Sequence, residues 1–284
     1  MPAVRSRLLV AAITAALLLV GVPAVSGSAG AATKWAPEAT AKIKPGVQMY
    51  TAGAQCTSNF VFKDKAGNVY VGYAAHCAGK GGSSDTNGCT TGTLPLGTAV
   101  SFVKGGNFFS GGTKVGSGRL AYTSWGTMHK LKTKSASRCA YNDFALVKVD
   151  KSSRGSVNPT VPKFGGPTGI ARPALAAGAP IYTVGNSSLR TGTATAKTGK
   201  VISTVGKKLA YELRTGNPGI PGDSGSGFMD GKGRIAGVLS TINLGLGSGV
   251  TNTMGNIAAE LLFAQKYSGI KGLVLVEGTR GFTK

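Results

Sequence analysis

Short β-branched segments separated by glycine-containing turns constrain the fold of this chain more than any other feature. Turn signals such as Ala66-Gly67-Asn68 and Asp230-Gly231-Lys232-Gly233 stand between neighbouring segments at hairpin spacing. Glycine accounts for 45 of the 284 residues, so such turns are available along the whole chain. The pattern predicts an all-β protein, built as an antiparallel sandwich or barrel. The clearest strand candidates are residues 61–62, 69–71, 145–149, 181–184 and 235–239.

Two stretches depart from the strand pattern. From Asn256 to Lys266 apolar residues recur at helical spacing, and Asn256 is available as the N-terminal cap, so this stretch predicts a helix. Lys151 to Ala177 is rich in serine, proline and glycine, which predicts a connection between two lobes. The residues that follow the helical spacing are Ile257, Leu261, Leu262 and Gln265.

The first 31 residues have the features of an export signal. Arg5 and Arg7 precede an apolar run from Leu8 to Val20, which is too short to span a membrane. Cleavage after Ala31 fits the small-x-small rule, and a site at Val25-Ser26-Gly27 fits nearly as well. We therefore expect a secreted, extracellular protein with no membrane association after cleavage. Residues 32–45 would then form a short pro-segment or linker.

The four cysteines predict disulfides rather than a metal site. They are even in number in an exported chain, and none belongs to a C-x-x-C pair. Four cysteines allow three pairings, and the sequence alone does not choose among them. No acidic cluster points to a metal either.

The formal charge of +22 shows a strong basic excess. Without Arg5 and Arg7, 30 basic side chains still face 10 acidic ones. A basic surface can concentrate anionic extracellular polymers. Because the lysines are scattered and not interleaved with aromatic residues, solubility is the favoured explanation, and nucleic acid is not expected as a partner.

Three local patterns carry residues suited to catalysis. His76 lies beside Cys77 at the end of an expected strand, in Tyr73-Ala74-Ala75-His76-Cys77, and is one of only two histidines. Asp143 stands directly before an apolar segment, where a buried carboxylate would need a partner. Ser224 lies in Gly222-Asp223-Ser224-Gly225-Ser226-Gly227, where a tight turn can aim N–H groups and the hydroxyl at one point. Singly, each pattern is often structural; together they supply a base, an orienting acid and a nucleophile.

The order His, Asp, Ser is that of chymotrypsin-type enzymes and not of subtilisins or α/β-hydrolases. The sequence resembles the chymotrypsin-like (trypsin-like) serine peptidases, particularly the bacterial secreted branch around α-lytic protease and the streptogrisins. The resemblance runs from about Gly46 to the C-terminus. The matching residues are Ala74 to Cys77, Asp143 to Val147, Gly222 to Gly227, Gly237 to Ser240, the helix from Asn256, Tyr267-Ser268-Gly269 and Leu273 to Val276.

This resemblance implies two six-stranded antiparallel barrels, residues 46–165 and 166–284, the second carrying a C-terminal helix and strand. His76 would take the proton of Ser224, and Asp143 would orient the imidazole in the cleft between the barrels. The N–H groups of Gly222 and Ser224 would bind the oxyanion. No cofactor or metal is implied. The implied disulfides are Cys56–Cys77 and Cys89–Cys139.

Asp223 marks a departure from the animal relatives. Those enzymes pair the acid before the serine with a new Ile-Val-Gly-Gly amino terminus, and no such start exists in this chain. Asp223 must therefore find an internal cation, and Arg172 is expected from its place between the lobes. The short stretch from Ala32 to Pro45 also leaves open whether the enzyme folds without a longer pro-segment.

The resemblance places a specificity pocket beside the serine. None of the expected pocket segments contains an acid, a histidine or a cation, so a charged P1 side chain would lose several kcal/mol of solvation there. We expect a neutral P1 residue of small to medium size, with Glu212 and Arg214 as the nearest charged residues in the sequence. The expected pocket residues are Pro218, Ser240, Thr241 and Gly249.

These observations predict a secreted serine endopeptidase that acts as a monomer on protein or peptide substrates. Two alternatives remain open. One is a catalytically inactive relative whose basic surface binds an anionic polymer, although inactive relatives typically lose a member of the triad. The other is an esterase that uses the same machinery, because fold and triad alone do not set the substrate.

Overall fold

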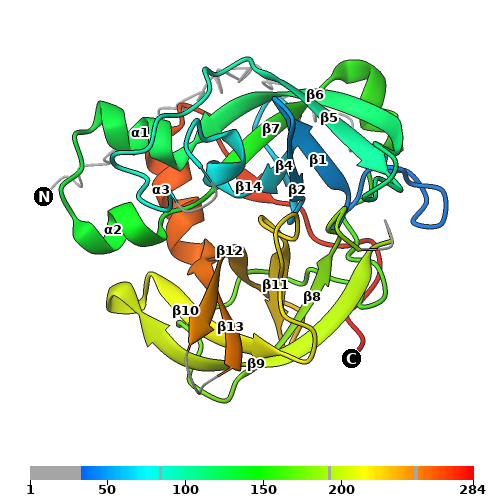
Figure 1. The fold of residues 1–284 in the computed structure, drawn as a ribbon. Coiled ribbons are helices and arrows are strands. Elements are labelled where there is room, and N and C mark those ends of the chain that lie inside the picture. The colour runs from blue at the N-terminus through cyan, green and yellow to red at the C-terminus, as the bar shows by residue number, and fades with distance from the viewer. Residues whose placement is uncertain (1–32, 83–84, 191–192, 246–248) are drawn as a thin grey trace, which may run out of the picture. The chain divides into compact units, whose positions relative to one another are not determined.

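The computed structural model describes residues 33–82, 85–190, 193–245 and 249–284 (Figure 1). The signal predicted for residues 1–31 lies outside these ranges. Thr33–Lys284 forms one compact unit. No helix within the described ranges has the length and apolar character needed to traverse a lipid bilayer.

The first lobe is an eight-stranded antiparallel sheet in the order β14-β3-β4-β7-β6-β5-β1-β2. It has two strands more than the predicted six, and its hydrogen-bonded ladder has two ends, β14 and β2. The short β14 returns from near the C-terminus and pairs with β3, which covers an edge that would otherwise expose unpaired N–H groups. The strands are β1 (Gln48–Thr51), β2 (Ala54–Thr57), β3 (Val61–Lys63), β4 (Val69–Tyr73), β5 (Ala99–Lys104), β6 (Thr113–Thr123), β7 (Ala145–Val149) and β14 (Val274–Leu275).

The second lobe is a closed antiparallel barrel in the order β10-β13-β12-β11-β8-β9. Its six strands and its closure agree with the predicted fold class, which is confirmed as all-β. Alternate side chains such as Val201, Leu213 and Met254 point inward and form the barrel core. The strands are β8 (Pro180–Gly185), β9 (Thr195–Val205), β10 (Ala210–Thr215), β11 (Gly227–Asp230), β12 (Ile235–Gly245) and β13 (Gly249–Asn256).

Helices occupy little of the described chain (Figure 1). The predicted C-terminal helix is α3 (Ile257–Tyr267), and the Asn256 side chain caps it by accepting the N–H of Ala258 at 3.1 Å. The predicted buried face was partly wrong, because Leu262 is 51% exposed while Glu260 is only 2% exposed. The neighbours of α3, which are α1, β12 and β13, select its buried face. The remaining helices are α1 (Ser124–Lys130) and α2 (Ala136–Tyr141), with 3₁₀ turns η1 (Ala75–Ala78), η2 (Lys151–Ser156) and η3 (Gly206–Lys208).

The segment from Thr33 to Pro45, predicted as a pro-segment or linker, lies against the residues that follow η2. Ile43 is fully buried and forms a parallel bridge with Val157, and the Ala36 N–H donates to the Val157 carbonyl at 2.9 Å. Backbone pairing and burial therefore make this segment part of the compact unit.

Candidate active site

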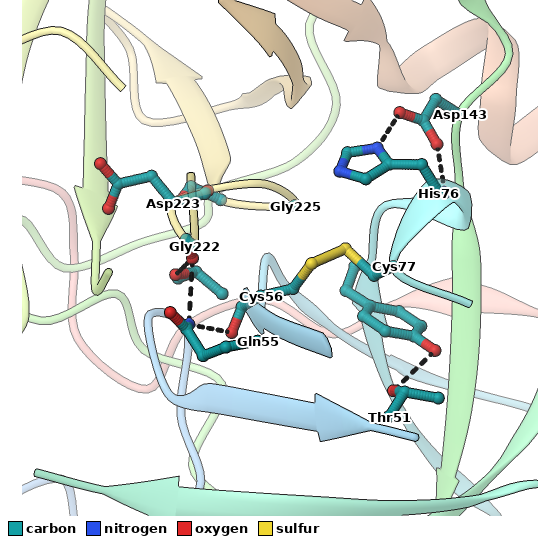
Figure 2. Close-up of a disulfide and its surroundings, with 12 residues drawn as sticks. Thr51, Gln55, Cys56, His76, Cys77, Asp143, Gly222, Asp223 and Gly225 are labelled. Atoms are coloured by element: carbon teal, nitrogen blue, oxygen red, sulfur yellow. Dashed lines mark hydrogen bonds and ion pairs between the residues drawn. A yellow bond between two sulfur atoms is a disulfide. The ribbon is translucent and has the colours of Figure 1, made fainter. Parts of the chain in front are cut away.

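His76 and Asp143 meet because β4 and β7 are antiparallel neighbours. His76 lies in η1 just after β4, and Asp143 lies two residues before β7, where Tyr73 pairs with Ala145. The two side chains face each other (Figure 2), with 2.7 Å between His76 Nδ1 and Asp143 Oδ2. The His76 backbone N–H also donates to Asp143 Oδ1 at 2.8 Å. This pairing assigns the ring proton to Nδ1 and leaves Nε2 as an acceptor.

The contact changes the acid–base properties of both groups. Burial alone would lower the pKa of His76, but the charge of the Asp143 carboxylate and its hydrogen bond outweigh burial and raise that pKa above its ordinary value. Burial alone would raise the pKa of Asp143, yet His76 and the Ser240 hydroxyl hold it below its ordinary value. Asp143 is therefore ionised near neutral pH. The His76 ring remains 25% exposed, so it can exchange protons with a substrate.

Two further residues hold Asp143 in place. Ser240 Oγ donates to Asp143 Oδ2 at 2.6 Å, and the Asp143 N–H donates to Glu260 Oε1 at 2.8 Å. Ser240 belongs to β12 of the second lobe, so both lobes position this carboxylate. Ser240 was expected in the specificity pocket, but its hydroxyl faces Asp143. Glu260 was not singled out, because its spacing put it outside the expected apolar face of the helix.

Ser224 lies in the turn before β11, where Gly222 and Gly225 adopt φ values of 92° and 88°. A Cβ at Gly225 would come within 2.9 Å of the Ala74 backbone nitrogen, so the turn sits against the segment that leads to His76. Only glycine fits that close approach and that φ. Among the described residues, no hydrogen bond joins Ser224 Oγ to His76 Nε2. The serine turn and the His76 segment are thus adjacent, while their reactive side chains are not bonded.

Two N–H groups of this turn, those of Gly222 and Ser224, donate to no described residue. The peptide groups that carry them are fixed from the other side, since the carbonyls of Pro221 and Asp223 each accept a serine hydroxyl, at 2.6 and 2.5 Å. The N–H and C=O of a trans peptide point in opposite directions. Both N–H groups therefore point away from these serines and are free to bind an anionic oxygen.

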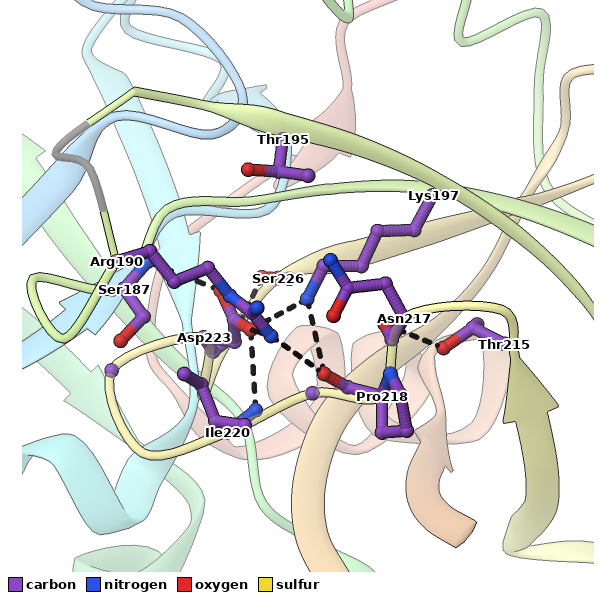
Figure 3. A network of polar contacts seen from close by, with 12 residues as sticks. Ser187, Arg190, Thr195, Lys197, Thr215, Asn217, Pro218, Ile220, Asp223 and Ser226 are labelled. Atoms are coloured by element: carbon purple, nitrogen blue, oxygen red, sulfur yellow. Dashed lines mark hydrogen bonds and ion pairs between the residues drawn. The ribbon is translucent and has the colours of Figure 1, made fainter. Parts of the chain in front are cut away.

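Asp223 belongs to this turn and is completely buried, and Lys197 is its cation (Figure 3). Lys197 Nζ lies 2.6 Å and Arg190 Nη2 lies 3.5 Å from Asp223 Oδ2. The prediction of Arg172 is wrong: its side chain is exposed and forms no ion pair with a described residue. Side chains along β9 alternate between inward and outward, and Lys197 points inward like Val201. This alternation was the signal that could have identified Lys197.

Burial lowers the pKa of Lys197, although Asp223 raises it in part and Arg190 adds a smaller lowering effect. The Asp223 carboxylate also accepts backbone N–H groups from Ser187 at 3.1 Å and Ile220 at 3.2 Å. The turn that carries Ser224 is thereby fastened to β9 and to the end of β8.

The predicted pocket residues fall in different places. Asn252 connects Thr241 with Gly219, the residue after Pro218: its Oδ1 accepts the Gly219 N–H at 2.8 Å, and its Nδ2 donates to the Thr241 carbonyl at 3.2 Å. Gly249 stands at the exposed end of the β12–β13 hairpin, with no atom near its missing side chain.

Charged residues also approach the predicted pocket. Arg190 Nη2 donates to the Pro218 carbonyl at 2.8 Å, so a cation adjoins a segment that has none of its own. Glu212 accepts the Thr251 hydroxyl at 2.9 Å. Arg190 was not expected near the pocket, because it lies 28 residues before Pro218 in the chain.

Both disulfides implied by the resemblance are present, Cys56–Cys77 and Cys89–Cys139. In Figure 2 the first of these lies between the His76–Asp143 pair and the glycine turn. Gln55, next to Cys56, donates to the Gly222 carbonyl at 3.1 Å. Although Cys56 and Cys77 lie near His76 with ligand-like spacing, their sulfurs are bonded to each other and are not free to bind a metal.

No protein-family model matches the sequence, and no curated protein matches it either. Among solved structures, protease A of Thermobifida fusca is similar, with a TM-score of 0.50 and 18% identity over 83% of this chain and 99% of that one. The Nocardiopsis protease and the chymotrypsin of Cellulomonas bogoriensis have TM-scores of 0.46 and 0.47, with 17% and 16% identity. Both alignments cover 82% of this chain, and they cover 98% and 99% of those proteins. At such identities the likeness concerns the fold alone, and protease A of Thermobifida fusca is the structure that supports it. The described chain has the fold of the chymotrypsin-like serine proteases.

Proposed function

We propose that this chain is a secreted serine endopeptidase that hydrolyses peptide bonds through an acyl-enzyme on Ser224. One observation carries the proposal: the bonded His76–Asp143 pair lies beside a serine turn whose Gly222 and Ser224 N–H groups have no described acceptor. A nucleophile, an oriented base and N–H donors available to an oxyanion are the parts that acyl transfer requires.

In the proposed reaction, Ser224 Oγ attacks the carbonyl carbon of the substrate while His76 Nε2 takes its proton. The carbonyl oxygen becomes an oxyanion and accepts the N–H groups of Gly222 and Ser224. Asp143 stabilises the imidazolium by charge and by the bond to Nδ1. His76 then gives the proton to the leaving amine as the C–N bond breaks, and water releases the acyl group by the same steps.

Ser224 and His76 must form their hydrogen bond during this cycle. Catalytic hydrogen bonds are often long before the substrate is bound and shorten in the complex. We therefore expect a substrate in the cleft to bring Ser224 Oγ within bonding distance of His76 Nε2. A crystal structure with a peptidyl boronate would measure this distance.

A neutral P1 residue is the second part of the proposal. The Asn252 amide is hydrogen-bonded to Gly219 and Thr241, which supports a pocket lined by neutral groups. Arg190 and Lys197 contact the Pro218 carbonyl, but both also pair with Asp223. Profiling on a mixed peptide library tests this. Dominant cleavage after Lys or Arg would refute it, and dominant cleavage after Glu would assign Arg190 as a substrate-binding cation.

Secretion and protein or peptide substrates complete the proposal. Two disulfides are typical of oxidising compartments, which supports an extracellular location. The signal itself is tested by N-terminal sequencing of the protein from the culture medium, which we expect to begin near Ala32.

Labelling with a fluorophosphonate tests the activity directly, because the reagent marks an activated serine. We expect labelling of the wild-type protein and none of Ser224→Ala. Absence of labelling in folded wild-type protein would favour a non-catalytic binding module. Labelling together with turnover of esters but not of peptides would favour an esterase.

A further inference from the structure

A second carboxyl group lies directly behind Asp143. Glu260, in the first turn of α3, is 2% exposed, and its Oε1 accepts the backbone N–H of Asp143 at 2.8 Å. Its other oxygen, Oε2, is buried without a hydrogen-bond partner among the described residues. A Cβ added at Gly255 would collide with the carboxyl group, so the end of β13 holds it from the opposite side. Glu260 is therefore packed against the end of β13 and the Asp143 backbone, and its one hydrogen bond among the described residues is to Asp143.

The surroundings of Glu260 offer it no ion pair among the described residues. Asp143, the one group hydrogen-bonded to it, is negatively charged, and the hydroxyl of Tyr122 is buried without a partner. Glu260 lines a cavity of about 400 Å³ between α2 and α3, and the cations Arg138 and Lys266 line the same cavity. The titratable and charged groups that face this region are Asp143 and His76 near β4 and β7, Tyr122 on β6, Arg138 and Tyr141 on α2, and Lys266 and Tyr267 on α3.

Two of these cations are engaged elsewhere. Arg138 lies over the ring of Phe263 at 5.0 Å, and Lys266 lies over the ring of Tyr267 at 5.1 Å. Burial raises the pKa of Glu260 well above its usual value; the Asp143 N–H offsets this in part, and the Asp143 carboxylate raises it further. A lone carboxylate in such a place would be costly, since an unpaired buried charge loses its hydration without compensation.

We propose that Glu260 is a positioning residue for the Asp143–His76 pair and that it acts as a neutral carboxylic acid. This proposal rests on the function proposed above. Glu260 supplies an acceptor oxygen that fixes the Asp143 backbone, and through it the orientation of the carboxylate toward His76. Being neutral, it adds no second negative charge behind the pair. A second charge would stabilise the His76 imidazolium further and weaken it as the proton donor to the leaving amine.

The first experiment follows the ring of His76 by NMR in a Ser224→Ala, His129→Gln background, where His76 is the only histidine. Glu260→Gln keeps the acceptor oxygen and cannot ionise, so we expect the pKa of His76 to stay at the value of the background protein. A clear fall of that pKa would mean that Glu260 is ionised in the folded protein, and the proposal would be overturned. Glu277→Gln, at an exposed position near the C-terminus, is the matched control.

The second experiment tests positioning. Glu260→Asp shortens the side chain by one methylene and should break the bond to Asp143 while keeping the acid. In the Ser224-containing enzyme we expect kcat to fall by about 10- to 100-fold with little change in KM, because a displaced catalytic group costs about this much. Glu260→Gln should recover most of the loss. An aspartate variant with wild-type kcat, or a glutamine variant as poor as the aspartate, would overturn the positioning role.

Infrared difference spectra separate this inference from the proposed function. A protonated carboxylic acid has a carbonyl stretch distinct from that of a carboxylate, and this band should be present in Ser224→Ala protein at neutral pH and absent after Glu260→Gln. Neither this band nor the His76 titration depends on turnover. If wild-type protein failed to react with a fluorophosphonate, the proposed function would fall while both spectroscopic results stayed interpretable.

Discussion

Asp143 and Asp223 are both almost completely buried, at 3% and 0% exposed. Asp143 accepts one backbone N–H and Asp223 accepts two, but the side chains that pair with them differ. Asp223 lies 2.6 Å from Nζ of Lys197, with which it forms an ion pair. Asp143 lies 2.7 Å from the His76 imidazole and accepts the hydroxyl of Ser240. One carboxylate is thus balanced by a fixed charge and the other by a group that can gain and lose a proton.

The difference separates two tasks. A fixed ion pair, with its partners held by backbone bonds, orients the turn that carries Gly222 and Ser224, because breaking it leaves a buried charge unpaired. An imidazole near its titration range gives the other carboxylate a partner whose charge changes during a reaction. Asp223 is therefore expected to set geometry, and Asp143 is expected to set proton affinity.

The largest effect on kcat should follow from removing the groups that transfer the proton, Ser224 and His76. Ser224→Ala and His76→Ala should each lower kcat by about 10⁴-fold or more, because nucleophile and base act as one unit. Folding should survive, since neither side chain fills the core. Kinetics on purified variants with matched thermal unfolding curves check this. A folded Ser224→Ala protein with a tenth of wild-type turnover would contradict the assignment.

Acidification should have the next largest effect, because it protonates His76. Since Asp143 raises the pKa of His76, kcat/KM should begin to fall at a pH above the ordinary imidazole value and then drop about tenfold per pH unit. The pH dependence of folding stability has the opposite direction to that of the rate. A raised pKa of His76 means that its pairing stabilises the fold below the unfolded imidazole pKa, and this contribution is lost as pH rises through the folded value. A pH–rate profile flat from about pH 5 to 9 would point to another base.

Breaking the fixed pair should damage the serine turn. Lys197→Met leaves the longer contact to Arg190 as the one ion pair of Asp223 among the described residues, so we expect a loss of about 3–5 kcal/mol in the free energy of unfolding. In the protein that still folds, kcat should fall by about 100-fold as the oxyanion donors lose their orientation. Lys200→Met, an exposed lysine on the same strand, is the control. Equal stability of the two variants would show that Lys197 does not hold the turn.

The same contrast explains how much could be predicted from the sequence. His76 and Asp143 stand at strand ends that pair in register, so local patterns and strand topology were enough to bring them together. Lys197, the cation of Asp223, could have been found from the alternation of inward and outward side chains along β9. Arg172 was chosen instead because it lies between the two lobes in the sequence. The burial of Glu260 could not be predicted, because the spacing of apolar residues over the 11 residues of α3 does not show which side of the helix its neighbours cover.

Removing the two disulfides in turn compares a bridge beside the candidate site with one farther from it. Replacing Cys89 and Cys139 by alanine should cost about 2–4 kcal/mol, mainly through the freedom gained by the unfolded chain, with little change in kcat. Replacing Cys56 and Cys77 should cost a similar amount and also lower kcat, because this bridge lies beside His76 and next to Gln55. Chemical denaturation and kinetics on both pairs test this. Equal kcat values for the two double variants would contradict it.

The smallest expected effect distinguishes two roles for Ser240. If its hydroxyl serves Asp143, as the 2.6 Å bond indicates, Ser240→Ala removes one hydrogen bond to a charged group. The loss should be about 1.5 kcal/mol, or roughly tenfold in kcat/KM. The pKa of Asp143 should rise, because one of the contacts that lower it is gone. The P1 preference in a peptide library should stay the same, since the hydroxyl faces the carboxylate and not the pocket.

Ser203→Ala on β9, whose hydroxyl has only a 3.4 Å contact with Glu212, is the matched control. A changed P1 preference with unchanged kcat would return Ser240 to the pocket and leave Asp143 held by His76 and Glu260 alone.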